Sequence, residues 1–193
     1  MTSYLAVIIG CSTGGVNALC KILSGIPKEF PLPIIVVSHL SPNAISMLST
    51  ILDNNTELSV IDAEEKVLPK AHHVYTAPPN YHLLIDDNGK FALNVDPKVC
   101  FSRPSIDVSF ETAAEYYREN LISIILTGAN SDGTEGSKMV KNNGGLVIVQ
   151  TPETAEAKTM PESVINAGYA DHIIPLQDIS AKLLELIGNR YEC

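Results

Sequence analysis

The sequence predicts a doubly wound α/β fold of three layers, in which helices cover both faces of a mostly parallel sheet. Strand-length apolar runs alternate along the chain with helical patterns, as expected for such a fold. Some runs, such as 122–126, are apolar almost throughout, which is typical of parallel strands that are buried on both faces. The 193 residues are 45% hydrophobic, enough to bury a sizeable core, so we expect residues 1–193 to form a single domain.

The individual elements follow from the same pattern. Apolar runs predict strands at 5–9, 33–38, 122–126, 146–149 and 171–174, and helical patterns predict helices at 15–24, 43–52, 106–119, 134–143, 161–167 and 178–188. The 57–101 stretch differs, because it carries several short apolar runs in succession, two of them joined by Asn88-Gly89, a strong hairpin signal. We therefore expect this stretch to form an antiparallel insertion on the main sheet.

Composition limits the classes of function. The net charge is −9, and no dense stripe of lysine and arginine is present, which disfavours a nucleic-acid partner. No apolar run reaches the length of a membrane span, and the first residues lack the basic region of a signal peptide. These observations predict a cytoplasmic protein without membrane insertion. The cysteines form no CxxC motif and are expected to be reduced thiols; they are Cys11, Cys20, Cys100 and Cys193.

A glycine-rich elbow follows the first predicted strand. Gly10-Cys11-Ser12-Thr13-Gly14-Gly15 leads directly into a helical pattern, which places Ser12 between a buried strand and a helix N-terminus. The unpaired N–H groups of a first helical turn suit either an anion or the oxyanion of a reaction at the serine. Strand alternation points Cys11 away from Ser12 and into the core.

Other uses of the elbow are disfavoured by the residues around it. No lysine follows the glycines as in a Walker loop, and the spacing does not fit a dinucleotide motif. The His72-His73 pair has no cysteine or carboxylate at ligand spacing. We therefore expect neither a metal nor an organic cofactor.

Three polar residues follow the ends of three predicted strands. Ser12 follows 5–9, His39 follows 33–38 and Asp132 follows 122–126, and parallel strands end at one edge of a sheet. A serine nucleophile needs a base such as histidine, and the histidine needs a carboxylate that orients it. Each residue also has a structural interpretation: Ser12 as a helix cap, His39 as a core histidine and Asp132 as a cap of the 134–143 helix.

The residues also resemble a known family. The elbow, the His39 segment, 77–82, 102–108, 126–128 with 132–133, and 159–161 occur in the order found in chemotaxis-receptor methylesterases of the CheB type. The resemblance implies a protein-glutamate methylesterase with Ser12, His39 and Asp132 as its catalytic triad. It further implies an oxyanion hole formed by the backbone N–H groups of Thr13 and Ala129, no cofactor, and a methyl-accepting chemotaxis receptor as the partner.

Two further expectations accompany this resemblance. Arg103 either contacts the receptor or ties its own loop to a helix C-terminus. The first strand begins almost at the first residue, so we expect a catalytic domain without the receiver domain that many family members carry.

Three functions stay open at this point. The first is a receptor methylesterase, with glutamine deamidation as a close chemical relative. The second is a serine esterase or amidase of the same fold that acts on another substrate. The third is a non-enzymatic module whose elbow binds an anion.

Overall fold

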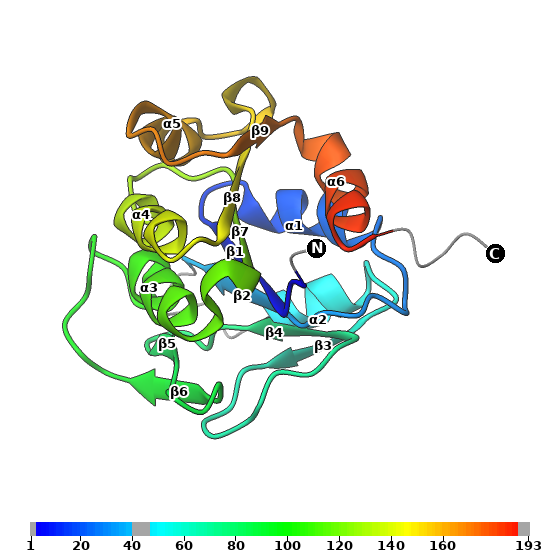
Figure 1. Cartoon of the computed structure of the whole chain (residues 1–193), viewed down its shortest axis with the longest axis vertical. Helices are drawn as coiled ribbons and strands as arrows, with labels where there is room; N and C mark the ends of the chain where they lie inside the picture. Colours follow the sequence, from blue (N-terminus) through cyan, green and yellow to red (C-terminus); the bar gives the residue numbers. More distant parts are fainter. Residues whose placement is uncertain (1–2, 40–46, 189–193) are drawn as a thin grey trace.

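In a computed structural model, which describes residues 3–39 and 47–188, the chain winds around one parallel sheet (Figure 1). Its seven strands stand in the order β3-β4-β2-β1-β7-β8-β9, and every neighbouring pair is parallel. The remaining two strands, β5 and β6, form a separate antiparallel hairpin. The order reverses around β1, which is where a doubly wound fold presents its ligand site.

The strands are short, and the central strands β1, β2 and β7 are buried throughout. They are β1 (Ala6–Cys11), β2 (Ile34–Ser38), β3 (Ser59–Asp62), β4 (His73–Thr76), β5 (His82–Ile85), β6 (Phe91–Asn94), β7 (Leu121–Ile125), β8 (Leu146–Gln150) and β9 (His172–Ile174). The helices are α1 (Gly15–Leu23), α2 (Leu48–Asp53), α3 (Ile106–Tyr117), α4 (Thr134–Asn142), α5 (Thr159–Asn166) and α6 (Ile179–Leu186). Short 3-10 turns occupy Arg118–Asn120, Pro152–Thr154 and Leu176–Asp178.

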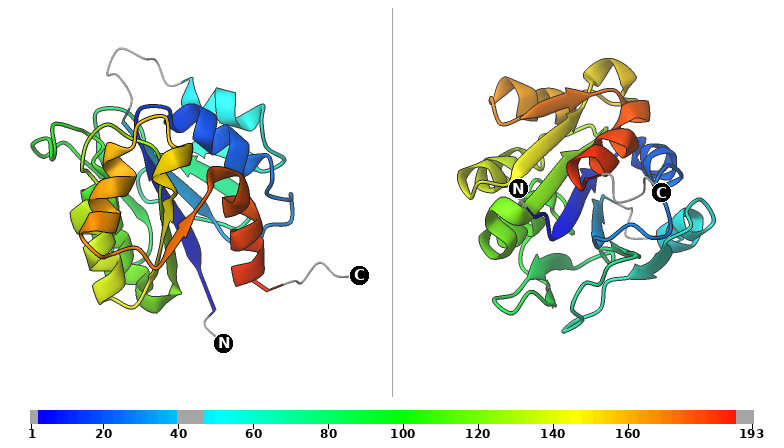
Figure 2. Two further views of the ribbon diagram at one scale, coloured as in Figure 1. Left: turned by 90° about the horizontal axis from the view of Figure 1, so that it is seen from above. Right: turned by 45° about the vertical axis from the view of Figure 1, so that its right-hand side comes forward.

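Two apolar cores lie on the two faces of the sheet. Alternate residues of β1 belong to different cores, since Val7, Ile9 and Cys11 pack on one side and Ala6 and Ile8 on the other. Helices α1, α2 and α6 cover the first side, and α3, α4 and α5 cover the second together with the β5–β6 hairpin. Figure 2 shows the helices on both faces of the sheet, which confirms the predicted three-layer, doubly wound fold.

The predicted strands and helices outside 57–101 are confirmed wherever the structure describes them. The predicted helix at 43–52 corresponds to α2, although residues 43–46 lie outside the described residues. Within the described ranges, no helix has the length and apolar character needed to cross a membrane.

The prediction for 57–101 is partly wrong. Only β5 and β6 form the antiparallel hairpin, whereas β3 and β4 are parallel strands of the main sheet. The connection from β3 to β4 contains no helix, and it packs instead against the hairpin, where Lys66 N donates to Phe91 O and Phe91 N to Val67 O. The hairpin signal at Asn88-Gly89 holds for β5 and β6 alone, because short apolar runs do not distinguish parallel from antiparallel pairing.

Candidate active site

Three neighbouring strands bring their polar ends together. In β1 and β2, Cys11 lies opposite Ser38, so the next residues, Ser12 and His39, leave adjacent strands at the same level. The N–H of His39 donates to the carbonyl of Cys11, at an N–O distance of 3.2 Å. On the other side of β1, the N–H of Ser12 donates to the carbonyl of Thr127, just beyond β7, at 2.9 Å. The predicted gathering of polar groups at this edge is therefore present.

A buried histidine–aspartate pair lies at this edge. The Nε2 of His39 lies 2.7 Å from the Oδ2 of Asp132, and the two side chains are 10% and 0% exposed. Because an ionised carboxylate accepts a hydrogen bond, the ring presents its proton at Nε2 to Asp132. The lone pair of the neutral ring is then on Nδ1, the atom that can take a proton from another group.

Asp132 is held by the first turn of α3. Its Oδ1 accepts hydrogen bonds from the hydroxyl of Ser105 at 2.9 Å and from the N–H of Asp107 at 3.0 Å, and its Oδ2 accepts one from the N–H of Ile106 at 2.8 Å. Burial acts to raise the pKa of Asp132, but the hydrogen bonds from His39 and these amides outweigh it and hold the pKa below its usual range. Asp132 is therefore an ionised partner for the histidine at neutral pH.

The helix caps considered as structural roles for Ser12 and Asp132 are not the ones observed. The N-cap of α1 is Gly14 rather than Ser12. The N-cap of α4 is Gly133, with no side-chain cap, so Asp132 serves α3 instead of the helix that directly follows it.

Asp107, in the first turn of α3, caps the N-terminus of α4 in the same way. Its Oδ1 accepts hydrogen bonds from the N–H groups of Gly133 and Gly136, at 2.9 and 2.7 Å. The two helices thus exchange caps, and each carboxylate meets the positive end of the other helix's dipole. Burial raises the pKa of Asp107 to about 6, the negative charge of Asp132 adds to this rise, and the two glycine amides oppose it.

The elbow around Ser12 depends on two glycines. Gly14 has φ 77°, a left-handed conformation that glycine adopts without strain, and a Cβ there would meet the side chain of Glu156 at 2.7 Å. A Cβ on Gly15 would lie 2.6 Å from the Sγ of Cys11. As predicted, Cys11 is fully buried in the core behind the elbow, and burial raises the pKa of its thiol to about 12.

The hydroxyl of Thr127 fixes the far side of the elbow. It donates to the carbonyl of Thr13 at 2.8 Å and accepts from the N–H of Ala157 at 2.8 Å. Thr127 is buried. The Thr13–Gly14 peptide is therefore held from the loop that follows β7, on the opposite side of β1 from His39.

The two amides predicted for an oxyanion hole lie in exposed residues. Thr13 and Ala129 are both exposed, on the loops that follow β1 and β7. Within the described residues, neither backbone N–H donates to a carbonyl or to a side chain. Both amides are thus available to a ligand at this edge of the sheet.

The second polar contact of the His39 ring involves Asn130. The Nδ2 of Asn130 lies 3.4 Å from the Nδ1 of His39, and its Oδ1 accepts from the N–H of Asp132 at 3.2 Å. Ser12 is half-buried, and in the described part of the chain no hydrogen bond joins its hydroxyl to His39. A hydrogen bond between the Ser12 hydroxyl and Nδ1 therefore stays a prediction.

Arg103 ties a loop rather than a helix end. Its Nη1 donates to the carbonyls of Val95 and Asp96, at 2.7 and 3.0 Å, in the loop that follows β6. This contact differs from the predicted tie to a helix C-terminus. A direct contact of Arg103 with a substrate stays a prediction.

One cluster of potential metal ligands occurs in the described residues. The Sγ of Cys100 and carboxylate oxygens of Asp107 and Asp132 lie within 4.8 Å of one another. The oxygens of Asp132 already accept hydrogen bonds from α3 and His39, and an oxygen of Asp107 accepts two from α4. The two carboxylates therefore cap helices, which does not favour a cation at this cluster.

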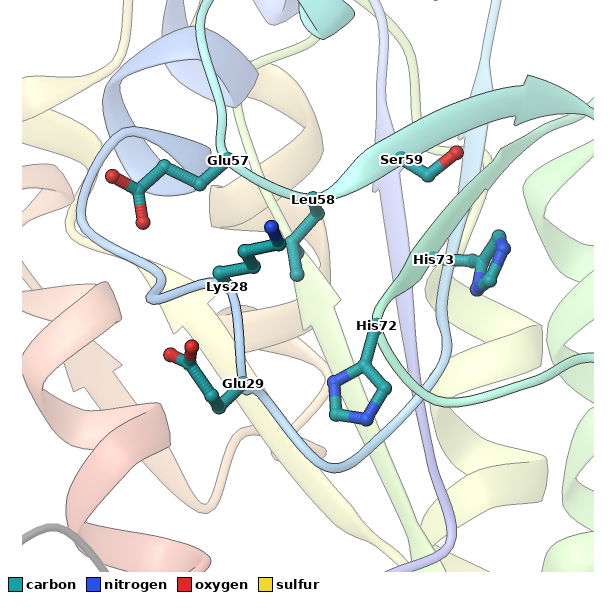
Figure 3. A pocket seen from close by; sticks show the side chains of 7 residues that line it. All are labelled: Lys28, Glu29, Glu57, Leu58, Ser59, His72 and His73. Atoms are coloured by element: carbon teal, nitrogen blue, oxygen red, sulfur yellow. The ribbon is translucent and has the colours of Figure 1, made fainter.

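A cavity of about 480 Å³ lies at the opposite end of the sheet (Figure 3). It opens where β3 and β4 begin, whereas the histidine–aspartate pair lies where the strands end. Its lining is formed by Lys28, Glu29, Glu57, Leu58, Ser59, His72 and His73. The His72-His73 pair thus belongs to a region remote from Ser12.

Sequence reasoning missed three residues of this site. Asp107 lies inside the 102–108 segment that carried the family resemblance, but its spacing gives no sign that it caps α4. Asn130 precedes Asp132 by two residues, a spacing typical of a local side-chain turn. Thr127 had a usable signal, because it directly follows a buried strand, as Ser12 nearly does.

The fold and the site place the chain among doubly wound α/β proteins that gather a serine, a histidine and an aspartate at the carboxyl ends of their strands. The sequence profile of the CheB methylesterase family matches residues 7–183. The chain therefore belongs to the CheB methylesterase family.

Individual relatives agree with this assignment. A Thermotoga maritima protein-glutamate methylesterase/protein-glutamine glutaminase is 44% identical over 94% of this chain, which spans 54% of that protein. A Leptospira interrogans protein that bears the same name provisionally is 45% identical over 98% of both chains. The crystal structure of the T. maritima CheB methylesterase catalytic domain superposes with a TM-score of 0.92 at 42% identity, covering 95% of this chain and 99% of that one.

Proposed function

We propose that this protein hydrolyses glutamyl γ-methyl esters on methyl-accepting chemotaxis receptors, in the cytoplasm, with residues 1–193 acting as a single catalytic domain. The observation that carries the proposal is the buried His39–Asp132 pair beside Ser12, in a chain of the CheB methylesterase family. The relatives' names supply the substrate class, since they describe protein-glutamate methylesterases.

The proposed reaction uses three side chains. The Oγ of Ser12 attacks the ester carbonyl carbon while the Nδ1 of His39 takes its proton, and Asp132 stabilises the resulting imidazolium. Collapse of the tetrahedral intermediate breaks the bond to the methoxy oxygen, which leaves as methanol with the proton from His39. Water then attacks the acyl-serine with His39 again as base, which releases the glutamate and restores the serine.

The proposed oxyanion hole is formed by two backbone amides. The exposed N–H groups of Thr13 and Ala129 face no acceptor among the described residues, which makes them the donors for the oxygen that becomes negative. A single such donor contributes roughly 3–4 kcal/mol to the transition state. Because the donors are backbone groups, the identity of the side chain at position 129 is not decisive for this step.

The test is methanol release from membranes that contain a methylated receptor. Wild type is expected to release methanol, and Ser12→Ala to lose turnover while its unfolding curve stays unchanged. A fluorophosphonate probe should label Ser12 stoichiometrically in wild type. Methanol release by Ser12→Ala at a near-normal rate would refute the assignment of the nucleophile, and failure to label would favour an anion-binding module.

Deamidation of receptor glutamine is a second candidate, favoured by the names of the relatives, which include protein-glutamine glutaminase. The same acyl-serine would form, with ammonia instead of methanol as the leaving group. Ammonia release from unmodified receptor measures this activity in the same preparation. A panel of small esters tests the alternative of a serine esterase with another substrate.

A further inference from the structure

The loop that joins β6 to α3, residues 95–103, carries an unusually exposed aromatic side chain. Phe101 is 96% exposed, and Val95 and Val99 in the same loop are 63% and 36% exposed. Cys100 and Phe101 both have positive φ, 48° and 62°, which is a costly conformation for a bulky residue. In this structure the strained backbone therefore presents an aromatic ring to solvent, where it contributes no packing.

The 95–103 loop is nevertheless held by specific bonds. The backbones of Val99 and Ser102 exchange two hydrogen bonds, at 3.2 and 2.8 Å, which close a tight turn around Phe101. At the base, Arg103 binds the carbonyls of Val95 and Asp96. Bonds at both the tip and the base hold the backbone from which the ring projects, which favours a recognition element over a passive linker.

The tip of this loop lies next to Asp132, the aspartate of the proposed catalytic triad. The Sγ of Cys100, the residue before Phe101, is 3.9 Å from an oxygen of Asp107 and within 4.8 Å of the carboxylate of Asp132. In Figure 2 (left), the loop projects sideways from the end of the molecule at which β1 meets α1. The loop that carries Phe101 therefore borders the site that contains His39 and Asp132, and we call this border its rim.

We propose that Phe101 is the docking contact for the protein segment that carries the ester, an α-helix with an apolar side chain beside the modified glutamate. This inference rests on the proposed function. A glutamyl side chain is short, so the backbone that carries it has to lie across the rim when the ester reaches Ser12. A helix about 10 Å wide covers such a rim. Burial of an exposed aromatic ring then supplies binding energy that a small ester cannot use.

The experiment compares two substrates. Phe101→Ala is expected to raise the KM for methanol release from methylated receptor by about tenfold or more, as for the loss of a central aromatic contact. Its kcat/KM for a small ester such as p-nitrophenyl acetate should stay within twofold of wild type. Phe101→Tyr should restore most of the affinity for the receptor. The matched control is Ile173→Ala, since Ile173 is 50% exposed on β9, an edge strand of the sheet.

The outcomes separate the two proposals. If wild type releases no methanol, the proposed function fails, and the docking proposal fails with it. If wild type is active and Phe101→Ala has an unchanged KM for the receptor, or loses activity equally on both substrates, only the docking proposal is overturned. Sedimentation velocity tests the competing occupant: a wild-type dimer that Phe101→Ala dissolves would assign the ring to self-association instead.

Discussion

Replacement of Asp132 by asparagine should separate the catalytic role of this residue from its structural role. The carboxylate accepts five hydrogen bonds, two at Oδ2 from His39 and Ile106 and three at Oδ1 from Ser105, Asp107 and Gly133. An asparagine retains one oxygen, which is best used where three donors converge. Its NH2 group then occupies the position of Oδ2 and faces two groups that donate in the wild type.

The expected effect on activity follows from the histidine. Facing an amide NH2, the Nε2 of His39 has to become the acceptor, so its proton moves to Nδ1, the atom that should take the proton of Ser12. The equivalent change in a serine protease triad lowers kcat by about 10⁴, and we expect a loss of roughly 10³–10⁴ here.

The expected effect on stability follows from α3. The buried N–H of Ile106 loses its acceptor, which costs about 1–3 kcal/mol. Loss of the negative charge at the helix N-terminus costs about 0.3–1 kcal/mol more. Urea unfolding should therefore show Asp132→Asn to be about 1–4 kcal/mol less stable than wild type.

Steady-state hydrolysis of a small ester and urea unfolding together check this prediction. Asp107→Asn is the matched control, because it makes the same chemical change in the same network at a residue that does not bind His39. Its kcat should fall less than tenfold. A kcat of Asp132→Asn within tenfold of wild type would refute the proposed role of the aspartate.

Three further predictions address the surroundings of the site. Asp107→Asn should also change the pH dependence of stability, because the folded pKa of about 6 exceeds the ordinary 3.8. The wild-type carboxyl group does not destabilise the folded state below about pH 4, where it is protonated, and destabilises it fully above about pH 6, where it is ionised. Allowing for partial exposure, the variant should gain about 1–2 kcal/mol on wild type between pH 4 and 7 in urea unfolding, and a gap that is constant with pH would contradict this. Thr127→Val removes the donor to the carbonyl of Thr13 and should lower kcat about tenfold in the ester assay, through displacement of that peptide, with unchanged kcat as the contrary result. Gly14→Ala forces a Cβ into a left-handed conformation and should cost at least about 1–2 kcal/mol in thermal or urea unfolding, whereas wild-type stability would show that the elbow adapts.

The sequence was most informative where burial decides the structure. The 122–126 run is apolar on both faces, and the corresponding strand, β7, is fully buried between β1 and β8. The sequence was less informative in 57–101, because the pairing partner of a short strand depends on segments far away in the sequence. Nothing local distinguishes β4, which pairs with both β2 and β3, from the hairpin strands that follow it.

The candidate site shows the same division. The residues Ser12, His39 and Asp132 could be predicted because each follows a strand end, and the topology brings strand ends together. The exchange of caps between α3 and α4 could not, since it depends on how closely the two helices approach. That approach is set by Gly136, where a Cβ would lie 2.7 Å from Phe110 and 3.0 Å from Asp107.

The exchanged caps make one opening motion relevant to both folding and chemistry. If α3 and α4 separate, Asp132 loses its hydrogen bond from Ile106, and Asp107 loses those from Gly133 and Gly136. The same fluctuation therefore exposes both helix N-termini and releases the carboxylate that binds His39. Hydrogen exchange at these amides would then proceed at a common rate. Conditions that loosen this pair of helices should abolish activity before the sheet unfolds.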